Sequence, residues 1–232
     1  MKSLWIALAF SLSFGLLAPD PVDAQFWKRN KDKDKKERKE KKEKKDEDRR
    51  CEDVDLEWMP SEDYSDLDAV TLTGISDLGI EIGTFTDGRR IEDPRELGRN
   101  IEDADDDDEE DRKTLYFTSD TDITEYVRAG AAEILYELGY KVVDSGGKVK
   151  ISGEIRKFHV EEDSTYEADV RIFFKVTRGG RTIYEGMHGE TDRTFGRSYK
   201  CENYMEVLAD ALIEVVHDMA ESDDFYDALA GR

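Results

Sequence analysis

One stretch of the chain decides the fold: residues 149 to 187 read VKISGEIRKFHVEEDSTYEADVRIFFKVTRGGRTIYEGM. From Tyr166 to Val176, apolar residues alternate with polar or charged ones, the period of a strand with one buried and one solvated face. Gly179 and Gly180 then make a two-residue hairpin connection into the next apolar run. The pattern predicts an antiparallel meander.

Two positions in this stretch depart from simple alternation. Near Arg156 and Lys157 the phase slips by one residue, which predicts a β-bulge. Phe173 falls on the solvated face among charged neighbours. An aromatic side chain there is either a contact site for a partner or is covered by a loop or by the linker that precedes the domain.

Two segments have the apolar period of an amphipathic helix. The first begins at Asp122, with Glu125 at the spacing of a capping box, and ends at Gly139, where a left-handed cap is expected. The second carries its apolar stripe from Met205 to Met219 and is followed by a last turn. Because each stripe needs a partner, we expect both helices to pack on the sheet.

Shorter apolar runs predict further strands at residues 70–72, 80–85, 115–117 and 140–143. The expected fold is therefore α+β, a mainly antiparallel sheet of about four to six strands packed by two amphipathic helices. Asp87 and Arg89 flank a glycine just after the run at 80–85. Such a pair either caps a turn or contacts a partner.

The N-terminus has the order of a secretory signal peptide, residues 1–24. Its apolar run is shorter than the roughly 20 residues that span a bilayer, and small residues precede the expected cleavage between Ala24 and Gln25. Residues 25–53 then form a charged linker, disordered or partly helical, and residues 54–232 a single acidic domain with an acidic loop at 102–112. We expect export to the periplasm of a Gram-negative cell, with secretion as the alternative.

Charge divides the chain into two unlike parts. Residues 28–50 hold 14 Lys or Arg against 8 Asp or Glu, a net of +6, whereas residues 51–232 hold 20 against 47, a net of −27. The acidic part repels nucleic acid and anionic lipid, because their phosphates meet an unfavourable long-range field, and we expect no binding of nucleic acid. The basic segment fits either a peripheral contact with an anionic membrane or envelope surface or a solvated spacer. The acidity fits either salt adaptation or recognition.

Cys51 and Cys201 are the two cysteines of the chain. In an oxidising compartment they form a disulfide across a long loop, or they remain two separate thiols.

No motif for catalysis or for a bound metal emerges. The acidic loop fails the EF-hand template, because Asp108 and Thr114 stand where that template requires Gly and Glu. The sequence has no zinc-ligand spacing, phosphate-binding loop or nucleophile elbow. We therefore expect no metal, no cofactor and no enzymatic activity.

Several elements resemble the YajG-like family of bacterial envelope lipoproteins. The similarity covers the strand with Phe85 followed by Asp87 and by Arg89 or Arg90, Leu97-Gly98, the helix end Glu137 to Tyr140, the strand Val149 to Phe158, the hairpin at Gly179-Gly180 and the terminal helix near Phe225. The resemblance implies a periplasmic α+β module without a defined biochemical activity. The family carries a lipidated cysteine where this chain has Gln25, which implies a soluble or electrostatically tethered form.

The expected function is that of an exported, non-enzymatic envelope module that docks a protein partner or another envelope component. Phe173, Asp87 and Arg89 are the candidate contacts. An alternative is a protein that binds cations or basic polymers through its acidic surface, and a third reading is a hydrolase with a dispersed active site. No motif specifies the partner or the oligomeric state.

Overall fold

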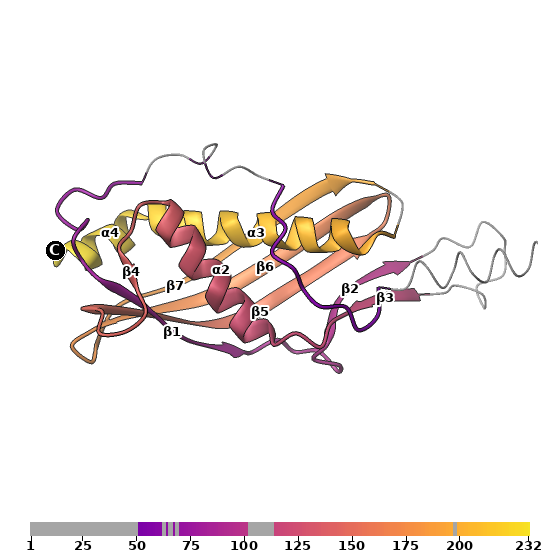
Figure 1. Ribbon diagram of the computed structural model, residues 1–232, viewed down its shortest axis with the longest axis horizontal. Coiled ribbons are helices and arrows are strands. Elements are labelled where there is room, and N and C mark those ends of the chain that lie inside the picture. The colour runs from indigo at the N-terminus through magenta and orange to yellow at the C-terminus, as the bar shows by residue number, and fades with distance from the viewer. Residues whose placement is uncertain (1–50, 62–63, 65–66, 68–69, 102–113, 197–198) are drawn as a thin grey trace, which may run out of the picture. The chain divides into compact units, whose positions relative to one another are not determined.

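The computed structural model describes residues 51–61, 64, 67, 70–101, 114–196 and 199–232, which fall in one compact unit (Figure 1). The signal peptide, nearly all of the charged linker and the acidic loop 102–112 lie outside the described residues. None of the helices in the described ranges is long and apolar enough to cross a bilayer.

A mixed sheet contains all seven strands of the described residues. They are β1 (Ile80–Asp87), β2 (Glu96–Ile101), β3 (Thr114–Thr118), β4 (Val142–Val143), β5 (Val149–Glu162), β6 (Thr165–Arg178) and β7 (Arg181–Phe195). β5, β6 and β7 form the predicted antiparallel meander. β6 lies along one side of β5, and β1 and β2 share its other side, one at each end.

The α+β class is confirmed, but the expected sheet is too small and too uniformly antiparallel. β1 pairs in parallel with β4 and β5, and β2 pairs in parallel with β5. The chain between β1 and β5 contains a helix, and such a crossover returns the chain in the direction that parallel pairing requires. The helix predicted between these two strands therefore indicated that the strands pair in parallel.

The strands of the structure differ from the predicted ones in three further places. Residues 70–72 form no strand, β7 continues to Phe195, and β2 occupies a segment that has no strand-like alternation. Pairing with β3 and β5 on its two sides holds β2 in extended form whatever its local preference. The bulge predicted near Arg156 is confirmed, because the register of β5 against β6 shifts between Ile155 and Lys157.

The helices are α2 (Ile123–Glu137), α3 (Cys201–Glu221) and α4 (Asp223–Ala230). Asp122 caps α2 as predicted, since its Oδ1 accepts from the backbone N–H of Thr124 at 2.9 Å. Glu125 does not close a capping box but binds Arg128 one turn ahead. Gly139 follows the helix with a φ of +89°, the left-handed conformation that glycine adopts without strain.

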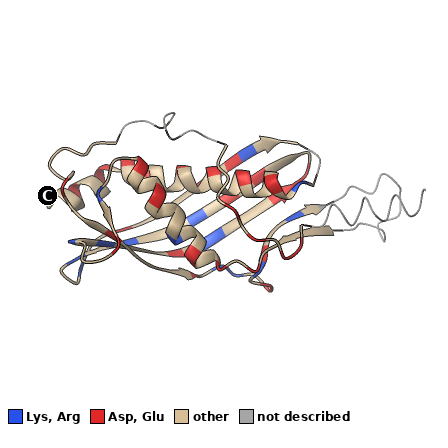
Figure 2. Ribbon diagram, viewed as in Figure 1, with Lys and Arg blue, Asp and Glu red and all other residues tan. Residues whose placement is uncertain are grey.

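The helices cover one face of the sheet and leave the other open (Figure 1). The covered face is apolar, and the buried members of β6 are Tyr166, Ala168, Val170, Ile172, Phe174 and Val176. Nearly the whole length of α3 is buried above them. In Figure 2 many Asp and Glu lie on the helices, whereas Lys and Arg appear on the strands behind them.

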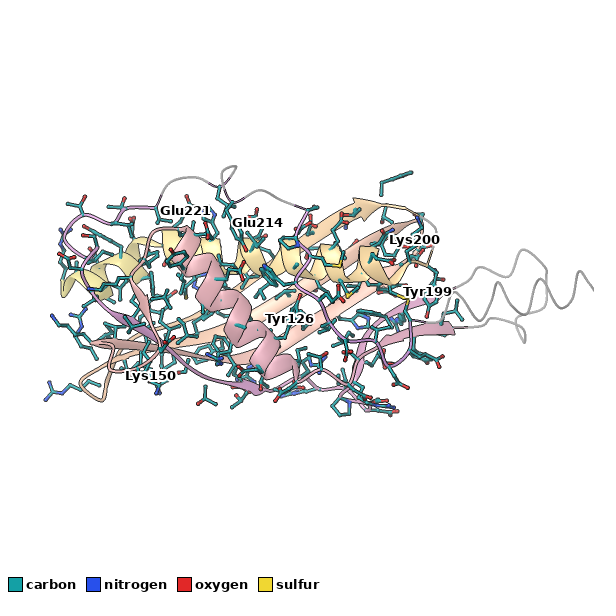
Figure 3. All side chains as sticks on the ribbon, viewed as in Figure 1. Tyr126, Lys150, Tyr199, Lys200, Glu214 and Glu221 are labelled. Carbon is teal, nitrogen blue, oxygen red and sulfur yellow. A yellow bond between two sulfur atoms is a disulfide. The ribbon has the colours of Figure 1, made fainter. Side chains whose placement is uncertain are left out.

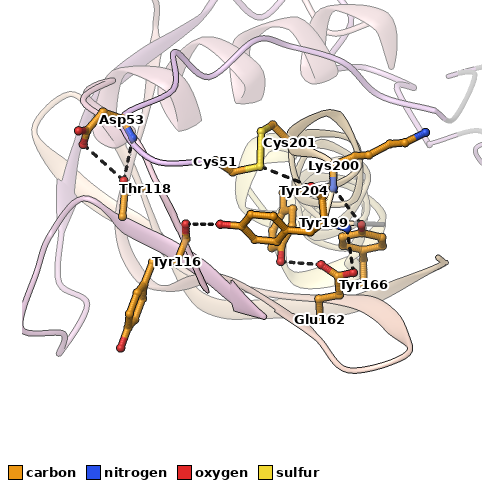
Figure 4. The surroundings of a disulfide bond; sticks show 10 residues. All are labelled: Cys51, Asp53, Tyr116, Thr118, Glu162, Tyr166, Tyr199, Lys200, Cys201 and Tyr204. Atoms are coloured by element: carbon orange, nitrogen blue, oxygen red, sulfur yellow. Dashed lines mark hydrogen bonds between the residues drawn. A yellow bond between two sulfur atoms is a disulfide. The ribbon is translucent and has the colours of Figure 1, made fainter. Parts of the chain in front are cut away.

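A disulfide joins Cys51 to Cys201 at the first residue of α3, with their Cα atoms 5.4 Å apart (Figure 4). The backbone of the segment beginning at Cys51 pairs with Thr118 in both directions, at 2.9 and 3.0 Å. Farther along, the backbone N–H of Ser61 donates to the buried Asp210 of α3 at 2.8 Å. Residues 51–61 are thereby held across the helical layer.

Replacing Cys51 or Cys201 with serine opens a loop of 150 residues. The free energy of unfolding in urea is expected to fall by about 2–5 kcal/mol, because the unfolded chain regains the entropy that the bridge removes. In the double-serine variant a reductant should have no further effect. Equal unfolding midpoints for the oxidised and reduced native protein would contradict the role of the bridge.

Candidate functional site

The candidate site begins with a gap in strand pairing. β1 pairs with β5 as far as Ile155, and β2 pairs with it from Val160 onward. Between these two points no described strand borders that side of β5, and the bulge lies in the same interval. β5 therefore has no strand neighbour on this side here, and other groups must satisfy the backbone N–H and C=O groups that a strand would otherwise bind.

Arg89 reaches one of these groups, the carbonyl oxygen of Phe158, and also binds the segment that leads into β2. Its Nη1 donates to the carbonyl oxygens of Glu96 at 3.1 Å and Phe158 at 3.5 Å, and its Nη2 donates to that of Pro94 at 2.6 Å. Asp87 fixes the guanidinium by accepting from Nε at 3.0 Å and from Nη2 at 2.8 Å. The Arg89 side chain is only 3% exposed, so this geometry is that of a backbone brace and not of a free contact residue.

The electrostatics of Asp87 agree with this role. Burial acts to raise the pKa of the carboxyl, but hydrogen bonds and charge from Arg89 outweigh it and hold the pKa below its ordinary value. Asp87 is therefore ionised at neutral pH and forms an ion pair with Arg89.

A cleft of about 760 Å³ opens beside this brace. Arg171 and Met187, which line it, alternate with buried residues of β6 and β7, so the cleft lies on the face of the sheet opposite the helices. Four segments supply its cationic lining: Arg89, Arg90, Arg99, Arg156, Lys157 and Arg171. Glu96 and Glu161 are the lining carboxylates, and Asp87, Glu154 and Asp169 bind four of the cations from beside the cleft.

Two of these cations share one carboxylate. Lys157 lies 2.6 Å from Asp169 and Arg171 lies 2.9 Å from it, on neighbouring strands. Burial acts to raise the pKa of Asp169, but hydrogen bonds from both cations outweigh it and lower that pKa. One carboxylate against two cations leaves a positive excess at the floor of the cleft.

Two further cations are paired at the cleft but remain accessible. Arg99 binds Glu161 at 3.0 Å and Arg156 binds Glu154 at 2.7 Å, with each arginine side chain 43% exposed. Exposed pairs of this kind contribute little, about 0–1 kcal/mol, so exchange for another anion costs little. Arg99 Nε, moreover, is buried without an acceptor among the residues that the structure describes.

The pKa of His159 indicates the sign of the electrostatic potential in the cleft. Burial lowers its pKa most, and the charges of Arg99, Lys157 and Arg89 lower it further, against an opposing effect of Glu161, to about 4. The imidazole is neutral at pH 7, and the net charge around it is positive.

Apolar side chains border the same cleft. Met187 is 52% exposed and Ile91 is 40% exposed, on strand β7 and on the loop after β1. Phe173, the aromatic predicted on the solvated face, is half-buried on the same face of the sheet, outside the lining of the cleft, and pairs in register with Met187. The sequence signalled Phe173 and the bulge, but it gave no sign that Ile91 and Met187 meet at one cleft.

Polar groups elsewhere serve the fold. Glu162 is 1% exposed and accepts from the Tyr204 hydroxyl at 2.8 Å and the Tyr199 backbone N–H at 3.2 Å (Figure 4). Burial, with a weaker contribution from nearby carboxylates, raises the pKa of Tyr199 to about 12. Figure 3 places Tyr199 and Lys200 at the start of α3 and Glu221 at its far end. This cluster anchors the N-terminus of α3 beside the disulfide.

A second polar chain links β7 to α3. His188 Nδ1 lies 2.6 Å from Asp218 Oδ2, and its Nε2 contacts the Tyr184 hydroxyl. His188 is 9% exposed, which makes this a contact between layers. No group of three or more His, Cys, Asp or Glu suited to a metal ion occurs in the described ranges.

Comparisons with known proteins give structural neighbours but no family. No family model matches the chain, and no curated protein is similar to it. A Xanthomonas campestris protein of the family DUF330 has a TM-score of 0.46 at 11% identity, covering 71% of this chain and 93% of its own. PelC from Paraburkholderia phytofirmans, solved as a dodecamer, has a TM-score of 0.37 at 8% identity over 63% of this chain and 89% of its own. Similarity this weak carries no inference on function, and the YajG-like resemblance stays a prediction.

Substitution of Arg89 tests the brace. Arg89→Met leaves Asp87 and three carbonyl oxygens without their donor, so we expect the free energy of unfolding to fall by about 2–4 kcal/mol. The matched control is Arg90→Met, an exposed neighbour that should change stability by less than about 0.5 kcal/mol. Chemical denaturation of both variants measures the difference, and equal stability of the two would refute the brace.

Acid titration tests the environment of His159. Its pKa in the folded protein is about 4 against an ordinary 6.5, so the unfolded chain takes up this proton first. The stability linked to His159 is complete above pH 6.5 and is lost as the pH falls toward 4. Compared with the native protein, His159→Gln should lose about 2 kcal/mol less between pH 7.5 and pH 4.5. Parallel stability curves for the two proteins would show that the shift is absent.

Proposed function

We propose that this chain is an exported, non-enzymatic binding module of the bacterial cell envelope, which recognises an anionic envelope component through the open face of its sheet. The observation that carries the proposal is the cationic cleft at the gap between β1 and β2. Export and periplasmic location rest on the signal-peptide pattern of residues 1–24.

The charge of the cleft is opposite to that of the domain around it. Residues 51–232 carry a net charge of −27, yet at the cleft six cations outnumber five carboxylates among the described residues when the salt-bridge partners Asp87, Glu154 and Asp169 are included. Five of these six cations have carboxylate partners in the described part of the chain, but nothing in the core requires Arg156 or Arg171, whose side chains are 43% and 57% exposed. A ligand of opposite charge explains why they converge.

Three carboxylates that hold the fold support a non-enzymatic role. Asp87, Glu162 and Asp210 each accept hydrogen bonds from groups that hold the fold: an arginine brace, a tyrosine cluster and the segment of Ser61. None of these three is among the residues lining the cleft. These three carboxylates serve the fold, and cations outnumber carboxylates in the lining of the cleft, which suits it to binding an anion.

The alternative function, cation binding by the acidic surface, has one described candidate. A hollow of about 360 Å³ is lined by Asp53 and Asp93 among other carboxylates. Arg95 already binds both, at 3.0 and 2.9 Å. A protein cation occupies the place that a metal ion or basic ligand would take, so the geometry favours the cleft.

Reversal of the cleft charge tests the proposal. We expect the Arg156→Glu/Arg171→Glu variant to lose a crosslinked component that the native full chain retains from intact envelopes. The control, Arg181→Glu/Arg193→Glu, makes the same change of charge at exposed positions outside the lining of the cleft and should retain it. Retention by both variants would count against the cleft. Deletion of residues 28–50 is a separate arm that reports only on the basic linker.

A further inference from the structure

Features of the cleft indicate which class of anion it binds. Three of them bear on the choice: the span of the cleft across the sheet, the positions of its apolar side chains, and the charge of the rest of the domain. Each excludes a different class of anion.

The first feature is geometric. The lining runs from the loop after β1, across β5 and β6, to Met187 on β7. Three strand spacings separate the two sides, a width of about 14 Å. A volume of about 760 Å³ is that of a site for a small organic molecule. A bare phosphate or carboxylate ion fills only a small part of it.

The second feature is the apolar border. Ile91 stands at one side of the cleft and Met187 at the other, with the cations between them. Met187 and its register partner Phe173 form an apolar pair on adjacent strands. Exposed apolar groups next to a charged floor match a ligand that is itself part charged and part apolar.

The third feature is the long-range field. A net charge of −27 over residues 51–232 repels a polyanion, because each further negative charge must approach an acidic domain. A nucleic acid, an acidic protein surface or a densely anionic membrane carries many such charges. A ligand with one acidic head group gains the local attraction of the cleft and bears the smallest repulsion.

The donors of the cleft suit such a head group. Arg99 uses Nη2 for the half-exposed Glu161 and leaves Nε without an acceptor among the described residues. An arginine fork binds a carboxylate or phosphate through two parallel hydrogen bonds. A ligand oxygen that displaces Glu161 would take its place on Nη2, and the buried Nε becomes a second donor when the side chain shifts to expose it. Arg171, on the other side of β5, shares the charge.

We propose that the cleft binds a single-chain amphiphile, an alkyl or acyl chain with one carboxylate or phosphate head, with the head between Arg99 and Arg171 and the chain against Met187. This inference rests on the proposed function, of which it specifies the ligand. The same head-and-chain chemistry exists in a free amphiphile and in a membrane lipid, and the experiment separates these sources.

Calorimetry with dodecyl phosphate, kept below its micelle concentration, tests the proposal on the full chain. We expect saturable binding at one site, with inorganic phosphate and the uncharged dodecyl maltoside each at least about tenfold weaker. Equal binding of the charged and uncharged amphiphiles, or of dodecyl phosphate and inorganic phosphate, would overturn the proposal. Binding to phosphatidylglycerol vesicles without binding of dodecyl phosphate would assign the site to a membrane surface and overturn it as well.

Variants locate the two ends of the ligand. Arg99→Gln/Arg171→Gln should weaken dodecyl phosphate binding about tenfold or more, and the matched control Arg181→Gln/Arg193→Gln should leave it within about twofold. Met187→Ser should weaken it and Met187→Leu should restore it, because the chain requires an apolar contact and not the sulfur. Equal effects of cleft and control pairs would place the ligand elsewhere.

The outcome also separates this inference from the function on which it rests. If dodecyl phosphate fails to bind while Arg156→Glu/Arg171→Glu still abolishes envelope capture, the ligand class is wrong and the cleft remains a binding site. If both effects are absent, the proposed function fails with the inference.

Discussion

β5 pairs with β6 along nearly its whole length but with β1 and β2 only at its two ends. This mismatch in strand length is the constraint on which the rest of the structure depends. A 14-residue strand at the centre of a sheet must satisfy its backbone on both sides. Where β1 has ended and β2 has not begun, Arg89 binds the carbonyl oxygens of Phe158, Pro94 and Glu96 and so links β5 to the segment that leads into β2.

The same interval of β5, between its pairing with β1 and its pairing with β2, shapes the open face of the sheet and places charged side chains on it. The bulge at Arg156 and Lys157 turns cationic side chains toward solvent, and the missing strand leaves room above them. Arg99 and Arg171 arrive from the strands on the two sides of β5. The gap in strand pairing beside β5 thus forms a cleft whose charge is opposite to that of the domain. The covered face carries the core, so the open face is free to vary for binding.

Local patterns predicted local structure well. The alternation from Tyr166 to Val176 predicted β6, the phase slip at Arg156 predicted the bulge, and Asp122 and Gly139 marked the ends of α2. Each signal lies within a few residues of the feature that it predicts. The expectation for Phe173 was right about its face of the sheet but gave no account of its register pairing with Met187 on β7.

What the sequence could not provide depends on contacts between distant residues. The parallel pairing of β1 with β5 joins segments about 70 residues apart, and β2 became a strand only through neighbours on both sides. Arg90, Arg99, Arg156 and Arg171 are ordinary charged residues until the topology brings them to one cleft. Asp87 and Arg89 stood out correctly in the sequence, yet only the hydrogen bonds show that they brace the sheet.

The central claim is that an anionic ligand binds at the gap beside β5. The most direct measurement is amide NMR of the full chain during titration with dodecyl phosphate, which reports every backbone position at once. The account predicts that the shifts gather at Gly88 to Ile91, at Arg156 to His159 and near Arg171 and Met187. Shifts that gather on α2 or α3, or that spread without a centre, would contradict it.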